Sequence, residues 1–264
     1  MSGTERAGRS PALAKQRMSL SEPDRIIVRG KDLCREVLGE LDFPSFLFLE
    51  IVGRPPSVVE TRMLNAVLVA IAEHGITPTS LSARLTYLGA PDSIQGAIAA
   101  GILGTGDVLL GAVEGCARLL QEAVTAQDTE EHLRQAVGRL RSSRERVPGL
   151  GHHLHKPLDP RSVRLFEMAD RAGLRETHRR AAELLQRIAE EVLQRELPIN
   201  ADGAVAAVLS DIGFDWRLAR GFAVVARAGG LLGHLADEMR QPIARAVWAL
   251  AEEGIGYEDP EAAF

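Results

Sequence analysis

The most informative stretch of the chain is PGLGHHLHKPLDPR, residues 148–161, which places three histidines between glycines and a proline-bounded basic segment. Glycine lets the backbone approach a ligand closely, because it carries no Cβ. Histidine can take up or release a proton near neutral pH. This combination is typical of a binding or catalytic loop, so we expect a functional site here rather than a piece of hydrophobic core.

Length and composition favour a helical protein. The chain has 264 residues, which is near the size of about 250 to 300 residues at which a single hydrophobic core stops growing. Hydrophobic residues make up 45% and aromatic residues only 4%, and Ala, Leu, Arg and Glu are abundant. These residues favour helices packed on helices over a sandwich or barrel. We therefore expect an all-α fold.

Charge and cysteine content exclude several classes of protein. A formal net charge of -5 argues against a nucleic-acid-binding protein, which would need a basic excess. Cys34 and Cys116 are too few for a disulfide framework and too far apart for paired metal ligands. No stretch approaches the ~20 consecutive apolar residues that span a bilayer, so we expect no membrane partner. A reduced cytoplasmic compartment is the simplest interpretation.

Apolar residues at helical spacing recur along most of the chain. Ser57 and Glu60 form a capping-box pattern ahead of a stripe that ends at Ile71, which predicts a helix there. The spacing of Leu33 and Leu41 also predicts a short helix, and Asp215 is expected to cap a long helix running to about residue 240. Residues 1–23 are rich in Ser, Arg, Lys and Pro and predict a disordered tail. All the regular structure predicted is helical.

The histidine-containing stretch resembles the active-site loop of citrate synthases, which reads roughly Pro-Gly-x-Gly-His, three or four variable residues, then Asp-Pro-Arg. His152 and Arg161 fall in the matching places. Further motifs follow the order seen in citrate synthase-like proteins over residues 25 to about 250: Gly53-Arg54-Pro55-Pro56-Ser57, Glu73-His74-Gly75, Ser82-x-Arg84, Asn200-Ala201-Asp202-Gly203, Arg227, Gly233-His234 and Arg245. Several motifs in order are stronger evidence than one.

The resemblance implies a domain organisation and an assembly. In citrate synthases a helical large domain is interrupted by a small helical domain that closes over the substrate. Here the large domain would comprise residues 24–111 and 215–264, and the small domain residues 112–214. The family forms dimers in which one arginine enters the partner's site, so we expect a homodimer or higher homo-oligomer, with Arg245 as that arginine.

One departure from the citrate synthase pattern is informative. Citrate synthases carry a second catalytic histidine in a Leu-His-Gly-Gly stretch, where it hydrogen-bonds the thioester oxygen, whereas this chain has Leu110 at that place. The chain is also short for a full citrate synthase. Both features resemble citryl-CoA lyases and the citryl-CoA-cleaving part of ATP-citrate lyase. The resemblance implies cleavage of citryl-CoA, or a related 3-hydroxyacyl-CoA, to acetyl-CoA and oxaloacetate, without a metal or redox cofactor.

The resemblance also implies catalytic roles. His152 would remove the hydroxyl proton of the substrate, and Asp202, kept protonated by burial, would deliver a proton to the methylene carbon. His74 belongs to the same catalytic group.

Ligand-binding roles follow from the same resemblance. The substrate carboxylates would be bound by His74, Arg161, Arg227 and Arg245, since a guanidinium matches a carboxylate bidentately. Coenzyme A, as part of the thioester substrate or product, would lie against Gly149, Leu150, Gly151 and His153, with Lys156 reaching a phosphate.

Several alternatives remain open from the sequence. The chain could synthesise citrate or methylcitrate, or bind CoA or a dicarboxylate without catalysis; a zinc- or DNA-binding helical module is a weaker possibility. Asp202 could simply cap the following helix, and His74 could be a residue at a helix C-terminus. His234 fits a packing role, and Arg245 fits a solvated helix face. The roles of His153 and His155 are open, because a His-His-x-His cluster could bind zinc but has no Cys or acidic ligand at metal spacing.

Overall fold

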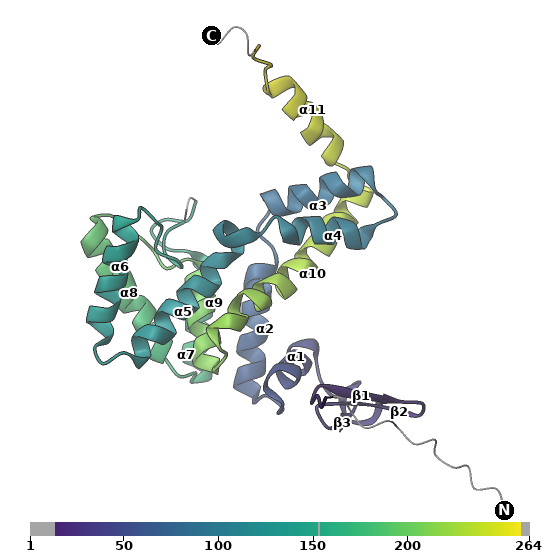
Figure 1. The fold of residues 1–264 in the computed structure, drawn as a ribbon, viewed down its shortest axis with the longest axis horizontal. Helices are drawn as coiled ribbons and strands as arrows, with labels where there is room; N and C mark the ends of the chain where they lie inside the picture. The colour runs from purple at the N-terminus through teal and green to yellow at the C-terminus, as the bar shows by residue number, and fades with distance from the viewer. Residues whose placement is uncertain (1–13, 153, 260–264) are drawn as a thin grey trace, which may run out of the picture. The chain divides into compact units, whose positions relative to one another are not determined.

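The computed structural model describes residues 14–152 and 154–259. The chain divides into two compact units, residues 1–61 and 62–264, and the boundary falls within one long helix, α2 (Val58–Ala72) (Figure 1). Helices account for most of the described residues, so the all-α prediction is confirmed. The further division into large and small domains at residues 112 and 214 stays a prediction.

The first unit begins with a small antiparallel sheet of three strands in the order β1-β2-β3. Ser19 pairs with Val28 across the first pair of strands, and Ile27 pairs with Asp32 across the second. The elements of this unit are β1 (Ser19–Glu22), β2 (Arg25–Val28), β3 (Lys31–Asp32), the π-helical turn η1 (Leu33–Val37), α1 (Phe43–Val52) and the start of α2.

Two predictions for this unit are wrong. Residues 19–22 form β1 rather than a disordered tail, because their backbone partners lie on β2 and composition does not reveal such pairing. Residues 1–13 of that predicted tail lie outside the described residues. The helix predicted between Leu33 and Leu41 shortens to η1, since Gly39 has a φ of 86°, a left-handed conformation that ends a right-handed helix.

The second unit contains the remaining helices. They are α3 (Pro78–Gly89), α4 (Ile94–Leu103), the π-helical turn η2 (Gly106–Leu110), α5 (Gly111–Thr125), α6 (Thr129–Ser142), α7 (Pro160–Ala172), α8 (Thr177–Leu193), α9 (Ala201–Ile212), the 3-10 turn η3 (Trp216–Leu218), α10 (Ala219–Arg240) and α11 (Ala244–Gly254). Among the described residues no single helix is long and apolar enough to cross a membrane, although the bent pair Ile94–Leu103 and Gly106–Thr125 passes on length and composition.

Helix α9 lies at the centre of one group of helices. It packs against α5, α7 and α8, and α6 covers α8 (Figure 1). Residues 203–210 are all buried, as expected of a helix that is surrounded on all sides. The N-terminus of α9 is therefore held in a fixed place by its own packing.

Helix α10 connects this group to the α3–α4 pair. Its first half packs on α5, and its second half packs on α3 and α4, where Ala83, Ala97, Leu231 and Leu235 form a buried cluster. Asp215 caps η3, which leads into α10, by accepting a hydrogen bond from the Arg217 amide at 2.9 Å. The prediction that Asp215 caps the long helix is thus wrong by one short turn, because Asp215 caps η3 and Leu218 is the N-cap of α10.

The capping box of α2 is also confirmed. The Ser57 amide donates to the Glu60 carboxylate at 2.6 Å, and the Glu60 amide donates to the Ser57 hydroxyl at 3.2 Å. The C-terminus of α2 meets α10 at Gly230, where an added Cβ would collide with the Ala72 carbonyl. A glycine at this position is therefore required for the close approach of the two backbones.

Two neighbouring glycines of α10 provide a matched test of this contact. We expect Gly230→Ala to destabilise the protein by about 1 to 3 kcal/mol, because the helices must separate. Gly229→Ala has nothing within 4 Å of its new Cβ and should instead stabilise the helix by about 0.5 to 1 kcal/mol. Urea unfolding of both variants measures the difference, and equal effects would contradict the close contact.

Candidate active site

Five of the six predicted catalytic and substrate-binding residues meet at one cavity of about 110 Å³. They come from the end of α2, the loop before α7, the start of α7, the start of α9 and the middle of α10. The residues are His74, His152, Arg161, Asp202 and Arg227, and Leu110 at the end of η2 lines the same cavity. The structure therefore brings together segments that lie far apart in the sequence.

The histidine loop, residues 148–159, is hydrogen-bonded to the segment that leads into α9. The Gly151 amide donates to the Pro198 carbonyl at 2.7 Å, and the Asn200 amide donates to the Gly149 carbonyl at 3.0 Å. The Asn200 side chain donates to the Gly151 carbonyl at 2.8 Å. A Cβ on Gly203 would collide with the Gly149 carbonyl. The two backbones can therefore approach each other this closely only because both positions are glycine.

Asp202 is not the cap of its helix. The N-cap is Asn200, whose side-chain oxygen accepts the Gly203 amide at 3.0 Å. Asp202 lies in the first turn, where its side chain is partly buried and lines the cavity. The capping interpretation of Asp202 is thus wrong, and its carboxyl group is available for chemistry.

Burial raises the pKa of Asp202 to about 6, and the neighbouring carboxylate of Asp159 acts in the same direction, while Arg161 and Arg227 oppose the rise. The N-terminus of a helix favours a negative charge, but that effect is smaller than the desolvation of this carboxyl group. Asp202 therefore exchanges its proton close to neutral pH.

Asp159 shows the opposite behaviour. Burial would raise its pKa, but hydrogen bonds and charge from Arg161 hold the pKa below its ordinary value. The carboxylate is fully buried and accepts from the Arg161 amide at 3.0 Å, from its guanidinium at 3.1 and 2.8 Å, and from the Ala201 amide at 3.1 Å. Asp159 thus stays ionised and fixes Arg161, a role that the sequence analysis did not assign.

Arg227 is a buried cation without enough partners. Among the described residues, its Nε and Nη1 atoms have no hydrogen-bond partner. Burial lowers the pKa of Arg227, while the carboxylates of Glu73 and Asp202 favour the charged form. Because unpaired buried charges are costly, this guanidinium indicates a site for an anionic ligand.

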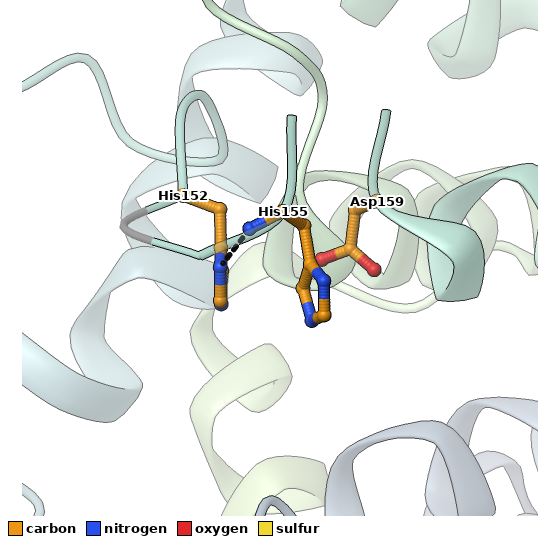
Figure 2. A group of neighbouring side chains, drawn as sticks. All are labelled: His152, His155 and Asp159. Carbon is orange, nitrogen blue, oxygen red and sulfur yellow. Dashed lines mark hydrogen bonds between the residues drawn. The ribbon is translucent and has the colours of Figure 1, made fainter. Parts of the chain in front are cut away.

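The imidazole rings of His74, His152 and His155 lie close together. His152 and His155 are stacked with ring centroids 4.4 Å apart, and His74 meets His152 edge-on at 5.3 Å. Nδ1 of His152 accepts the Leu154 amide at 3.1 Å. It also accepts the His155 amide at 3.0 Å (Figure 2). A nitrogen that accepts carries no proton, so a neutral His152 has its proton on Nε2.

His74 has a lowered pKa because of burial and, to a smaller extent, because of the cations Arg161 and Arg227. The imidazole is therefore neutral around pH 7, where it can donate one hydrogen bond and accept another. His74 follows the end of α2 rather than capping it, since its side chain lines the cavity.

An acidic side chain does lie at metal-ligand distance from the histidines, contrary to the sequence-based expectation. Candidate ligand atoms of His152, His155 and Asp159 lie within 4.8 Å of one another (Figure 2). However, each Asp159 oxygen already accepts two hydrogen bonds. Stacked rings also direct their nitrogen lone pairs along similar planes rather than toward one point. These residues therefore do not fit a zinc site.

Two larger cavities flank the histidine loop. One, of about 1000 Å³, is lined by Gly149, Leu150 and Gly151 together with the arginines 118, 139 and 146. The other, of about 580 Å³, is lined by Lys156 and Arg195. These arginines were not among the predicted site residues; Arg146, for example, belongs to the charged run 141–146, which has the composition of an ordinary surface turn.

Three residues that the sequence singled out remain: the predicted site residues His153 and Arg245, and His234, for which a packing role was favoured. His153 lies outside the described residues. Arg245 is exposed on α11 and does not line the cavity of its own chain, so its role in a partner's site, and the homodimer itself, stay predictions. His234 is partly buried in α10 and makes polar contacts rather than only packing.

Comparison with known proteins places this geometry in a family. The family model for the citrate synthase C-terminal domain matches residues 27–247. The chain belongs to the citrate synthase family. Among solved structures, it is similar to a citryl-CoA lyase from Hydrogenobacter thermophilus, with 30% identity, a TM-score of 0.83 and coverage of 94% of this chain and 95% of that one.

Two other similar proteins are longer than this chain. An ATP citrate lyase from Methanosaeta concilii, solved with (3S)-citryl-CoA, shares the fold at 21% identity and a TM-score of 0.77, covering 96% of this chain and 42% of that one. Citrate synthase 2 of Bacillus subtilis is 28% identical over 195 residues, which are 74% of this chain and 51% of the synthase. The chain thus spans about half the length of that relative.

The raised pKa of Asp202 predicts a stability change that depends on pH. Its folded value of about 6 exceeds the ordinary value of 3.8, so the folded state binds more protons between these two values and loses stability as pH rises through them. Asp202→Asn removes the buried charge. The free energy of unfolding of Asp202→Asn should equal that of the wild type near pH 3.5 and exceed it by up to about 3 kcal/mol at pH 7.

Urea unfolding of the wild type and Asp202→Asn across this pH range measures the change. The exposed Asp92 supplies the control, because Asp92→Asn removes a solvated carboxylate and should leave the pH dependence unaltered. A constant difference between Asp202→Asn and the wild type at every pH would show that Asp202 is not desolvated.

Proposed function

We propose that this protein is a citryl-CoA lyase, which cleaves citryl-CoA, or a related 3-hydroxyacyl-CoA, to acetyl-CoA and oxaloacetate. The observation that carries the proposal is the cavity wall, where Asp202, with a pKa of about 6, lies with the incompletely paired Arg227 and the apolar Leu110. The likeness to the Hydrogenobacter thermophilus citryl-CoA lyase over nearly its whole length supports it.

The dicarboxylate part of the substrate is assigned to the cationic side of the cavity. Arg161 is held by Asp159, and Arg227 has two nitrogen atoms ready to donate to a carboxylate. Neutral His74 supplies a further donor without adding charge. An ion pair between a carboxylate and Arg227 is favourable here because this guanidinium is already buried, so little further desolvation of it accompanies binding.

Cleavage requires a proton to leave the hydroxyl group and another to reach carbon. Breaking the carbon-carbon bond converts the alkoxide to the ketone of oxaloacetate and leaves the electron pair on the acetyl-CoA enolate. Asp202 in its protonated form then gives its proton to the enolate carbon. A pKa of about 6 suits this step, because both protonation states are accessible near neutral pH.

The geometry of His152 refines the role that the resemblance implies for it. With Nδ1 accepting two amides, neutral His152 presents an Nε2 proton and so donates to the substrate oxygen. To accept the hydroxyl proton at Nε2, the ring would have to carry its proton on Nδ1, which breaks both amide contacts. The present loop geometry thus fits stabilisation of the oxygen, and proton removal by His152 requires the loop to rearrange.

Leu110 determines how the thioester oxygen can be hydrogen-bonded in this site. An apolar side chain makes no hydrogen bond to the thioester oxygen, so its enolate must be stabilised by a backbone amide or by water. The CoA moiety is assigned to the two cavities beside the histidine loop, where Arg118, Arg139, Arg146 and Lys156 can bind phosphates.

Citrate or methylcitrate synthesis is the second candidate. It is favoured by relatives such as citrate synthase 2 and the citrate/2-methylcitrate synthase of Bacillus subtilis, each 28% identical to this chain. That reaction adds hydrolysis of the thioester and therefore releases free CoA, whereas simple cleavage or its reversal does not.

The proposal predicts the products formed from synthetic citryl-CoA. The purified protein should release oxaloacetate and acetyl-CoA without free CoA, measured by coupled oxaloacetate reduction and by chromatography of the CoA species. Asp202→Asn should lower turnover by at least about 100-fold, because its amide cannot protonate carbon, and His152→Ala should do likewise. Circular dichroism of each variant checks that it remains folded.

Each other outcome of this assay points to a different function. Citrate and free CoA as products would identify a synthase. CoA binding without turnover would identify a non-catalytic binding protein. Full lyase turnover by Asp202→Asn would show that Asp202 does not supply the proton.

Arg227 gives a separate prediction for ligand binding. Arg227→Gln should weaken oxaloacetate binding about 10- to 100-fold, because a charged hydrogen-bond donor is lost. The same change should raise the melting temperature of the free protein, since it removes a buried cation with unpaired nitrogens. Isothermal titration calorimetry and thermal unfolding measure both effects. Arg240→Gln, at the exposed end of the same helix, is the control and should change neither.

A further inference from the structure

A buried ion pair joins α3 to α10 in the second unit. Nη1 of Arg84 donates to the Glu238 carboxylate at 2.6 Å, and the side chains are only 3% and 4% exposed. Nη2 of Arg84 also donates to Asp237 at 2.8 Å. With its guanidinium held on two sides, Arg84 presents fixed donors to its remaining neighbour, His234.

The orientation of the His234 ring follows from Arg84. Nδ1 of His234 lies 3.3 Å from Nε and 3.1 Å from Nη2 of Arg84. A guanidinium has only donors, so Nδ1 must accept and the ring proton lies on Nε2. That nitrogen faces Glu73, at 3.1 and 3.0 Å from its two carboxylate oxygens, and donates to it.

Glu73 holds the backbone of the bend on which His74 lies. Its Oε1 atom accepts the His74 amide at 2.9 Å and the Gly75 amide at 2.5 Å. Gly75 has a φ of 72°, so the chain reverses there immediately after α2. The carboxylate therefore determines where the backbone of His74 lies, and with it the imidazole on the cavity wall.

We propose that His234 is a positioning residue of the active site, which is oriented by Arg84 and holds Glu73 so that His74 stays on the cavity wall. It acts on His74 only through Glu73 and the backbone. In catalysis the inference rests on the proposed function, because His74 is assigned there to the substrate carboxylates, but the structural link can be tested without substrate.

The surroundings of His74 make it a sensitive reporter of this link. Its pKa is lowered by burial and by neighbouring cations, so loosening the turn at Glu73 should let water reach the ring and raise that pKa. The titratable and charged groups around His74 in the described chain include His152, His155, Asp159, Arg161 and Arg227, together with Asp202, which lines the same cavity. Glu73 also favours the charged form of Arg227, so its displacement affects both ligand-binding groups.

Variants of His234 separate the donor to Glu73 from simple packing. His234→Gln keeps an amide NH₂ at the reach of Nε2 and should preserve the hydrogen bond to Glu73. His234→Asn is too short to reach Glu73 and should release it. Because His234 touches a buried ion pair, Glu73→Ala provides a second way to break the link, at a side chain that is 52% exposed.

The control is His178, a second histidine that pairs with a carboxylate among the described residues of this unit. His178 and Asp211 lie 2.9 Å apart, at the opposite end of α9 from Asp202. His178→Asn should destabilise the protein as any broken buried pair does, without changing His74. A purely structural role of His234 predicts the same result for His234→Asn.

The first experiment is an NMR pH titration of the His74 ring in each variant, which needs no ligand. His234→Asn and Glu73→Ala should each raise the His74 pKa by about half a unit or more, and the double variant should raise it no further. His234→Gln and His178→Asn should leave it unchanged. An unaltered His74 pKa in His234→Asn and Glu73→Ala, or additive shifts in the double variant, would overturn the proposal.

The second experiment measures oxaloacetate binding by calorimetry in the same variants. We expect about tenfold weaker binding for His234→Asn and for Glu73→Ala, the same loss in the double variant, and near-complete recovery in His234→Gln. If the His74 titration behaves as expected but the wild type neither binds oxaloacetate nor cleaves citryl-CoA, the positioning role stands and the proposed function fails. If cleavage is seen but His74 does not respond, the reverse holds.

Discussion

The approach of two glycine backbones, Gly149 and Gly203, is the constraint on which the site depends. Neither position has room for a Cβ, and hydrogen bonds from Asn200 and Gly151 tie the histidine loop to the start of α9. Helix α9 is itself immobilised by packing on all sides. The packing of α9 therefore fixes the position of the histidine loop. As a result, His152 and Asp202 line the same cavity although they lie far apart in the sequence.

The local environment gives two carboxyl groups of the site different pKa values. Asp159 accepts four hydrogen bonds and stays ionised, whereas Asp202 has no such partners among the described residues, and burial raises its pKa to about 6. Two titratable groups driven apart in this way are a common basis for acid and base roles in one site. The ionised carboxylate fixes Arg161, which is assigned to substrate binding, and the carboxyl group with the raised pKa is assigned to proton transfer.

The citrate synthase fold supports both condensation and cleavage, so the fold alone does not determine the reaction. The choice depends on a few side chains at the cavity, among which Leu110 removes a hydrogen-bond donor and Arg227 keeps a buried charge for an anionic ligand. The network from Glu238 through Arg84 and His234 to Glu73 extends this control to α3 and α10. Residues that never touch the ligand are in this way part of the same site.

The sequence by itself determined the helical class and most helix positions, since capping residues such as Ser57 and Asp215 and the apolar spacing are local signals. It also identified His74, His152, Arg161, Asp202 and Arg227 as one group, through motifs in the family order. It did not reveal the strands β1, β2 and β3, whose hydrogen-bond partners lie on neighbouring strands. Only the tertiary structure decided that Asn200 rather than Asp202 caps α9, that Asp159 is saturated with donors, and that His234 faces Glu73, because burial and hydrogen-bond partners depend on segments that meet only in the folded chain.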